Sequence, residues 1–184
     1  MPGWYTPCAA MDSLTTPRLL LRPMQPDDAP GILALDSDPE VLRYLPNQLI
    51  STLAEAAATV DYVRQQYEQN GIGRWAVVRQ DTGEFVGWCG IKLVNDHVIN
   101  GRTNYYDIGY RLLQRHWGQG FASEAAQASF RYAFEVLQLP EIHATAMHGN
   151  HASRRILERL GMTEQEEFVM DEAAWYWYTA VNSL

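Results

Sequence analysis

The spacing of hydrophobic positions changes along the chain in a way that predicts both strands and helices. Apolar residues return every three or four positions over 122–137, which places them on one face of a helix. A capping box at Thr52 and Glu55 predicts a second long helix that ends before Gly71. This order of elements predicts one α+β domain over residues 16–182. Strands are expected at 18–23, 74–79, 84–91, 105–112, 141–147, 163–170 and 174–181, and further helical segments at 26–35, 39–45 and 150–160.

The first 15 residues predict a loose N-terminal leader ahead of the domain. They lack the basic and continuous apolar regions of a signal peptide, and no charge-free apolar run in the chain reaches the roughly 18 residues of a membrane span. The two cysteines, Cys8 and Cys89, are too few for a disulfide framework, and their spacing suits no metal site. We therefore expect a cytoplasmic protein with no metal and no membrane partner.

The balance of charge bears on the kind of partner that the chain can bind. A formal net charge of −8 argues against a general nucleic-acid binder, which needs a surface that neutralises phosphates. The segment 107–160 is about neutral, because it carries six basic residues and five acidic ones, so the excess of acidic residues lies elsewhere in the chain. An anionic ligand would find its arginines in this segment, and a cationic substrate would be drawn to the acidic remainder.

A strand, a glycine-rich turn and a helix follow one another over residues 105–137. This order aims free backbone N–H groups and the positive end of a helix dipole at an anion. A P-loop is excluded, because the only lysine of the chain, Lys92, lies far from any Gly-Lys-Ser/Thr sequence. A dinucleotide fingerprint fits poorly, because Ser123 stands where the third glycine is needed. The turn is therefore predicted to hold a phosphate-bearing cofactor of another kind.

One short motif in this turn, Arg115-x-x-Gly118-x-Gly120, resembles the Q/R-x-x-G-x-G/A acyl-CoA signature of the GNAT superfamily of N-acetyltransferases. The segment around it, 107–125, is similar to the RimJ/RimL-like branch of that superfamily. Segment 16–22 resembles the opening strand of the branch, and 150–162 resembles its Asn-x-x-Ser helix. The three segments occur in the order that the branch has and together span most of the chain.

The resemblance implies a GNAT fold: a mixed, mostly antiparallel central sheet in which two neighbouring strands splay apart, with helices on both faces. It also implies that acetyl-CoA is the co-substrate and that N–H groups of the turn hold its pyrophosphate, with glycines letting the diphosphate approach. The pantetheine arm would lie between the splayed strands and bond the side-chain amide of Asn150, whose other reading is a helix N-cap. The residues expected to contact the cofactor are Tyr110, Arg111, Leu112, Arg115, His116, Trp117, Gly118, Gln119, Gly120, Phe121, Ala122 and Asn150.

The chemistry needs a base that takes a proton from the attacking amine and a hydroxyl that protonates the departing thiolate. In several GNAT enzymes this hydroxyl belongs to a tyrosine seven residues after the helix asparagine, but Leu157 occupies that position here. The branch implies Ser153 as the donor instead; its other reading is a polar residue of the first helical turn. Asp107, on the central strand, is the candidate base, and the alternative is that it pairs with an arginine. Weaker candidates for the base are Glu164, Glu166 and Glu167.

The sequence therefore predicts an acetyl-CoA-dependent N-acetyltransferase that acts on a primary amine, either a protein N-terminal α-amine or a small amine. Direct transfer in a ternary complex is expected, because Cys89 lies in a predicted hairpin strand and is badly placed for a covalent intermediate. Two alternatives stay open: an acyl-CoA-binding sensor with little turnover, since the tyrosine donor is absent, and a partner-binding protein with a vestigial cleft. The expected partners are acetyl-CoA and the amine acceptor, and a homo-oligomer is left open.

Overall fold

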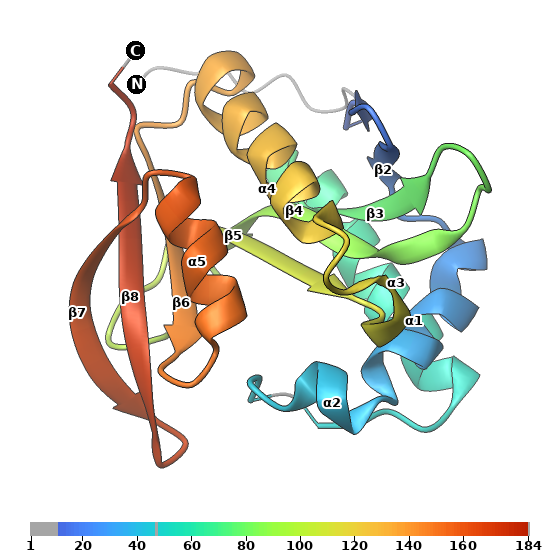
Figure 1. Ribbon diagram of the computed structural model, residues 1–184, viewed down its shortest axis with the longest axis horizontal. Helices are drawn as coiled ribbons and strands as arrows, with labels where there is room; N and C mark the ends of the chain where they lie inside the picture. Colours follow the sequence, from blue (N-terminus) through green and yellow to red (C-terminus); the bar gives the residue numbers. More distant parts are fainter. Residues whose placement is uncertain (1–10, 47, 184) are drawn as a thin grey trace.

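The computed structural model describes residues 11–46 and 48–183. In this part of the chain the strands are β1 Leu14–Thr15, β2 Leu19–Pro23, β3 Arg74–Arg79, β4 Phe85–Val94, β5 Tyr105–Leu112, β6 Glu141–Met147, β7 Thr163–Met170 and β8 Ala173–Val181. They form one sheet in the order β1-β2-β3-β4-β5-β6-β8-β7 (Figure 1). Every neighbouring pair is antiparallel except β5 and β6, which are parallel.

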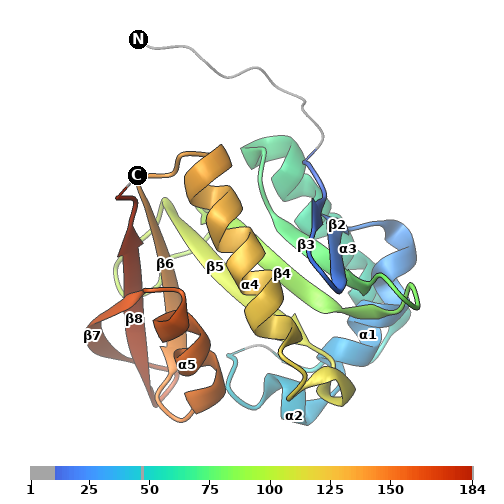
Figure 2. The same cartoon turned by 45° about the horizontal axis from the view of Figure 1, so that its top comes forward.

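Helices cover both faces of this sheet. The α-helices of the described residues are α1 Ala29–Asp36, α2 Pro39–Leu42, α3 Leu53–Asn70, α4 Phe121–Arg131 and α5 His151–Arg159. Short 3-10 turns at Pro26–Asp28 and Gln114–His116 precede α1 and α4, and a π-helical turn at Tyr132–Val136 extends α4. Figures 1 and 2 show α4 and α5 on one face of the sheet and α1 and α3 behind it on the other.

A separate hydrophobic core fills the space between each helical layer and the sheet. The core under α4 and α5 includes Leu21, Ile91, Leu112, Phe121 and Leu157, all buried. The core under α1, α2 and α3 includes Ile32, Leu35, Val60 and Ala76, also buried. Two apolar layers on one mostly antiparallel sheet confirm the predicted α+β fold class with helices on both faces.

The long helix α3 begins and ends at the residues that the sequence indicates. The Thr52 hydroxyl accepts a hydrogen bond from the Glu55 N–H at 3.2 Å, and the Glu55 carboxylate accepts one from the Thr52 N–H at 2.9 Å. This reciprocal capping satisfies donors that the first helical turn leaves unpaired. At the other end Gly71 adopts φ 69°, the left-handed conformation that closes a helix.

Residues 11–15 pack against the sheet, although they fall in the segment predicted to be a loose leader. Met11 is buried in the core under α4, and the Asp12 carbonyl accepts a hydrogen bond from Trp75 Nε1 at 2.8 Å. Leu14 and Thr15 pair with β2 as a short edge strand. The rest of the predicted leader, residues 1–10, lies outside the described residues.

The parallel strands β5 and β6 meet at one place only. Asp107 and His143 form their single pair in register, and the two strands diverge towards their carboxyl ends. The backbone edge of β5 beyond Asp107 is therefore paired to β4 on one side and has no neighbouring strand on the other. Strands β5 and β6 are therefore the splayed pair that the resemblance implies. The family counts these two strands as its fourth and fifth.

Candidate active site

The turn between β5 and α4 presents backbone N–H groups that no protein group uses. Gly118 has φ 73° and Gly120 has φ 81°, in the left-handed region that favours glycine. Within the described part of the chain, the N–H groups of residues 118–123 donate no hydrogen bond. Gly120 is also the N-cap of α4, so the positive end of the helix dipole lies at the same place. An anion can gather several donors here without displacing a protein contact.

The side chains of this turn have contacts of their own. His116 is buried and packs against Phe121, with ring centroids 6.1 Å apart. Trp117 is 46% exposed and donates from Nε1 to a carbonyl at the end of β5 at 2.8 Å. Arg115 forms an ion pair with Glu84 at 2.9 Å, and its hydrogen bond lowers the pKa of that carboxyl. Because Glu84 engages the guanidinium, the backbone of Arg115 is what it contributes to the turn.

The residues expected to contact the pantetheine arm lie on the unpaired stretch of β5. The Leu112 side chain is buried in the core. Arg111 turns to the opposite face of the sheet, where its Nη1 donates to Asp36 at 2.6 Å in a buried ion pair at the end of α1. Tyr110 points back towards α5. With the side chains occupied in this way, the edge of β5 offers backbone groups alone, as pairing with an extended ligand requires.

Asn150 acts as the N-cap of α5. Its Oδ1 accepts a hydrogen bond from the Ser153 N–H at 3.1 Å, which is the structural alternative that the sequence left open for this residue. Its Nδ2 has no hydrogen-bond partner among residues 11–46 and 48–183. The cap and a bond from Nδ2 to a bound cofactor are therefore compatible.

Ser153 lies against a tyrosine that the sequence did not single out as an acid. The Tyr110 hydroxyl donates to the Ser153 carbonyl at 3.0 Å and lies 3.1 Å from Ser153 Oγ. Burial raises the pKa of Tyr110, so its hydroxyl stays protonated at neutral pH. With the tyrosine proton directed at the carbonyl, the serine hydroxyl is the donor in the 3.1 Å contact between the two hydroxyls. A tyrosine hydroxyl from β5 thus lies beside Ser153 at the first turn of α5.

Asp107 pairs with an arginine, which is the alternative reading of this candidate base. Arg74 donates from Nη2 to Asp107 Oδ2 and from Nη1 to the Asp107 carbonyl, the latter at 2.7 Å. The Asp107 side chain is 19% exposed and the Arg74 side chain 11%, so the pair is largely buried. Oδ1 of Asp107 has no hydrogen-bond partner in the part of the chain that the structure describes. One carboxylate oxygen is therefore fixed, and the other is left for a further donor.

Arg74 reaches Asp107 across an intervening strand, and the glycine at position 109 leaves room for its guanidinium. Arg74 stands opposite Gly90 on β4, and Gly90 stands opposite Gly109 on β5. A Cβ at position 109 would lie 2.8 Å from Arg74 Nη2. A side chain here would push the guanidinium away from Asp107 at the point where β5 and β6 diverge. Gly109, a glycine inside a predicted strand and two residues from Asp107, is the sequence signal for this close approach.

The weaker candidates for the base are engaged elsewhere, on the outer strand β7. Glu164 accepts hydrogen bonds from Arg154 at 3.2 Å and from a β8 tyrosine hydroxyl. Glu166 accepts one from Asn100 at 2.8 Å. Strands β6 and β8 separate β7 from β5, and Glu167 is on the same outer strand. None of the three shares the point of divergence with Asp107.

We expect Cys89→Ala to leave kcat unchanged, because this thiol cannot act as a nucleophile. Cys89 is fully buried on β4, and burial raises its pKa to about 11, so the reactive thiolate is scarce at neutral pH. The check is the steady-state rate of the variant beside that of the wild type at equal protein concentration. A folded variant without activity would show that Cys89 takes part in the chemistry. The other cysteine, Cys8, lies outside the described residues.

The described residues hold neither a metal cluster nor a membrane-spanning helix. Among residues 11–46 and 48–183, no group of three or more His, Cys, Asp or Glu side chains could hold a metal ion. His148, one of a pair at metal-ligand spacing with His151, instead lies 2.9 Å from the Tyr176 hydroxyl through Nδ1. No helix of the described chain is both long and apolar enough to cross a membrane.

Comparison with known proteins finds relatives over most of the chain. The family model for the acetyltransferase (GNAT) domain matches residues 18–163. The uncharacterized N-acetyltransferase p20 of Bacillus licheniformis is 32% identical over 155 residues, 84% of each chain. The FsC-acetyl coenzyme A-N(2)-transacetylase of Aspergillus fumigatus is 33% identical over 162 residues, 86% of this chain and 68% of that one.

A solved structure agrees with these relatives on the fold. The acetyltransferase (GNAT family) of Bacillus anthracis superposes with a TM-score of 0.78 at 25% identity and covers 94% of this chain and 100% of its own. The predicted GNAT fold is thereby confirmed. The free N–H groups of the turn and the splayed strands are found in a chain whose relatives are named as N-acetyltransferases. This chain therefore belongs to the GNAT acetyltransferase family, and the prediction of an acetyl-CoA-dependent N-acetyltransferase is confirmed.

Proposed function

We propose that this enzyme moves the acetyl group of acetyl-CoA directly to a primary amine, with both substrates bound at once. The supporting observation is that two sets of backbone groups without partners lie next to each other: the N–H groups of 118–123 and the edge of β5 beyond Asp107. A diphosphate matches the first set. The amide-bearing pantetheine arm matches the second, because an extended amide chain can bond to a strand edge. Nδ2 of Asn150 would bond the same arm from α5.

For the acceptor we propose a protein N-terminal α-amine or a small amine, within the RimJ/RimL-like branch of the family. The branch rests on the motif segments 16–22, 107–125 and 150–162. The net charge of −8 favours a cationic acceptor over an anionic one. The printed name of the Aspergillus relative, with transfer to an N(2) position, also supports a nitrogen as the atom that is acetylated. A cytoplasmic location and a homo-oligomer remain predictions.

The amine would approach Asp107 from the face of the sheet that carries α1 and α3. Side chains alternate along β5, so Asp107 shares a face with Arg111, whose partner Asp36 ends α1. Tyr110 and the cofactor turn belong to the opposite face, with α4 and α5. An amine with a pKa of about 8–10 must lose a proton to attack. The unpartnered Oδ1 of Asp107 would accept that proton while Arg74 holds the carboxylate in place.

Ser153 would protonate the sulfur that leaves. Asp107 takes the first proton of the ammonium group before the attack. As the new C–N bond forms and the thioester C–S bond breaks, the nitrogen loses its second proton to solvent and the Ser153 hydroxyl proton passes to the thiolate. Tyr110 holds the serine by its carbonyl at 3.0 Å and stays protonated, so it orients the donor. When CoA leaves, Ser153 regains a proton from solvent and Asp107 releases to solvent the proton that it took from the amine. Backbone N–H groups on the free edge of β5 would stabilise the oxyanion.

Ser153→Ala is expected to lower kcat about tenfold to 100-fold, with a much smaller change in the KM for acetyl-CoA. The reason is that the alanine removes the proton donor while the turn that holds the pyrophosphate stays intact. Tyr110→Phe is expected to lower kcat less, because it removes only the group that orients Ser153. Steady-state kinetics with saturating acceptor measure both effects. An unchanged kcat in Ser153→Ala would remove this residue from the mechanism.

The direct route is tested by intact-mass spectrometry of the enzyme after rapid acid quench. We expect no acetylated enzyme when acetyl-CoA is supplied without acceptor. We expect none during turnover either, because the only cysteine among the described residues is buried and protonated. An acetylated enzyme that forms and decays as fast as kcat would contradict the ternary-complex mechanism.

A sensor that binds acyl-CoA without turnover is the second candidate function. The missing tyrosine favours it, since Leu157 stands at the usual position of the donor. The hydroxyl pair of Tyr110 and Ser153 supports turnover instead, because it supplies a donor at the first turn of α5. The two functions differ in whether acetyl-CoA is consumed.

A further inference from the structure

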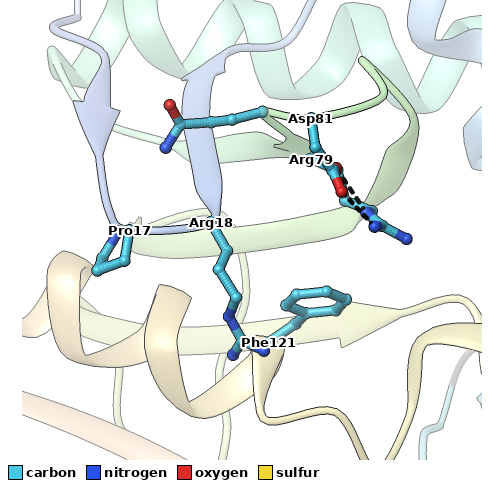
Figure 3. A pocket seen from close by; sticks show the side chains of 6 residues that line it. Pro17, Arg18, Arg79, Asp81 and Phe121 are labelled. Atoms are coloured by element: carbon cyan, nitrogen blue, oxygen red, sulfur yellow. Dashed lines mark hydrogen bonds and ion pairs between the residues drawn. The ribbon is translucent and has the colours of Figure 1, made fainter.

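Arg18, just before β2, reaches across to the first turn of α4 and to the cofactor turn. Its Nε donates to Glu124 Oε2 at 2.7 Å, and its Nη2 lies 2.6 Å from the same oxygen. Its Nη1 donates to the Gln119 carbonyl at 2.9 Å. Its guanidinium also lies over the Phe121 ring, 4.5 Å from the centroid. Figure 3 shows the Arg18 side chain extending from the strand to Phe121, at the edge of a hollow of about 320 Å³.

Glu124 is held from its other side as well. Its Oε1 accepts hydrogen bonds from the Thr16 hydroxyl at 2.6 Å and from the Arg18 N–H at 3.0 Å. Both oxygens of the carboxylate are thus used, and the side chain is only 16% exposed. Glu124 therefore fixes the guanidinium of Arg18 in one orientation, with Nη1 on the Gln119 carbonyl. We name this set of contacts among Thr16, Arg18, Gln119 and Glu124 the clamp.

The clamp fixes the direction of one peptide group in the anion-binding turn. In a trans peptide the C=O and the following N–H point in opposite directions. Arg18 draws the Gln119 carbonyl towards itself, so the Gly120 N–H points away from Arg18. Gly120, at φ 81°, leaves this peptide group free to rotate at small cost, because glycine adopts positive and negative φ almost equally well. Rotation would present a carbonyl oxygen, instead of an N–H, to a bound diphosphate.

The clamp also offsets a charge that would oppose the cofactor. Glu124 lies in the first turn of α4, where a carboxylate competes with a bound phosphate for the positive end of the helix. The guanidinium of Arg18, at 2.6 Å, balances that carboxylate. The turn then meets the diphosphate without a net negative neighbour.

We propose that Arg18 and Glu124 are positioning residues for the cofactor turn, and that the clamp makes the enzyme select acyl donors that carry a diphosphate. The inference rests on the proposed placement of the acetyl-CoA pyrophosphate at residues 118–123. The proposal predicts that removing Arg18 weakens the use of acetyl-CoA alone. Without Arg18, the enzyme uses acetyl-CoA poorly and uses a donor that lacks the diphosphate as well as before.

The test compares the KM for acetyl-CoA with the KM for S-acetylpantetheine in Arg18→Met, which keeps the apolar stem over Phe121. We expect the KM for acetyl-CoA to rise about tenfold, the effect of losing a charge-assisted contact, and that for S-acetylpantetheine to stay the same. The matched control is Arg79→Met. Arg79 lies 5.8 Å from the same ring and pairs with Asp81, but it has no contact with the turn carbonyl, so both KM values should be unchanged.

The outcomes distinguish a failure of the clamp from a failure of the proposed pyrophosphate placement. If the wild type uses both donors with equal KM, the pyrophosphate is not bound at the turn and the proposed placement fails. If the wild type prefers acetyl-CoA and Arg18→Met keeps that preference, only the clamp fails. An equal rise in the KM values for acetyl-CoA and S-acetylpantetheine in Arg18→Met would also contradict the clamp. Such a result would mean that the substitution disturbs the whole site.

A second variant tests whether Glu124 acts through Arg18. Glu124→Gln alone should raise the KM for acetyl-CoA, since it releases the guanidinium. In the Arg18→Met background the same change should raise that KM no further. A further rise in the double variant would show that Glu124 acts independently, and the clamp would be refuted.

Discussion

We expect the Gly120→Trp variant to lose acetyl-CoA binding while the protein stays folded. Gly120 has φ 81°, and its N–H is among those of the turn that donate no hydrogen bond within the described chain. An indole at this position would fill the space that the diphosphate needs in order to approach the backbone. A Cβ here would lie 3.4 Å from Arg18 Nη2, so the variant also displaces the guanidinium of the clamp, which is 47% exposed and outside both hydrophobic cores. Isothermal titration with acetyl-CoA measures the loss.

The matched control for this variant is Gly101→Trp. Gly101 also adopts a positive φ, 73°, and a Cβ there would meet nothing within 4 Å. It lies in the loop between β4 and β5, outside the cofactor turn. Both variants should lose a similar amount of the free energy of unfolding. The loss should be about 1–2 kcal/mol, which is the cost of a left-handed conformation for a residue with a Cβ. Normal acetyl-CoA affinity in Gly120→Trp would overturn the assignment of the turn.

The second large effect is expected at Asp107, where the change to asparagine should lower kcat about 100- to 1,000-fold. Asparagine has nearly the same shape and can keep a hydrogen bond from Arg74, but it cannot accept a proton from the amine. The variant should recover part of the lost rate as pH rises, because a growing fraction of the acceptor is already neutral. The KM for acetyl-CoA should change little, since the cofactor turn is elsewhere. The measurement is kcat against pH with one acceptor.

A control carboxylate on the same face of the sheet separates catalysis from stability. Asp36→Asn removes the negative charge from the buried ion pair with Arg111. Asp107→Asn removes the negative charge from the ion pair with Arg74. Both variants are expected to unfold at a lower temperature, because each leaves an arginine without a full partner charge. Only Asp107→Asn should reduce kcat by two orders of magnitude or more, about the contribution of a general base. Equal kcat values in the two variants would show that Asp107 is a structural residue alone.

Local signals in the sequence predicted the turn and most element boundaries. The two glycines at 118 and 120 indicate a turn from their spacing, and both adopt the positive φ that glycine permits. The capping box at Thr52 and Glu55 likewise depends on neighbours three residues apart. The strand predicted at 84–91 extends to Val94, since β4 stays paired with β5 up to Tyr105. Pairing with a partner strand, and not the residues themselves, sets that boundary.

The contacts around the proposed catalytic residues could not be predicted, because they join residues distant in sequence. Tyr110 meets Ser153 only after α5 docks beside β5. Arg74 meets Asp107 only in the register that places Gly90 and Gly109 opposite each other. The family pattern places a tyrosine hydroxyl on α5, at position 157, where this chain has leucine. The tyrosine hydroxyl that lies beside Ser153 comes from β5, and no local pattern indicates that contact.

The most direct test of the proposed transfer is the release of free CoA thiol from acetyl-CoA across a panel of N-terminal peptides and small amines. We predict release that depends on the acceptor, saturates with both substrates, and exceeds the rate without acceptor. Saturable binding of acetyl-CoA with no release above that background, for any acceptor of the panel, would contradict this prediction. The protein would then be a sensor of acyl-CoA, and the roles given to Asp107 and Ser153 would be wrong.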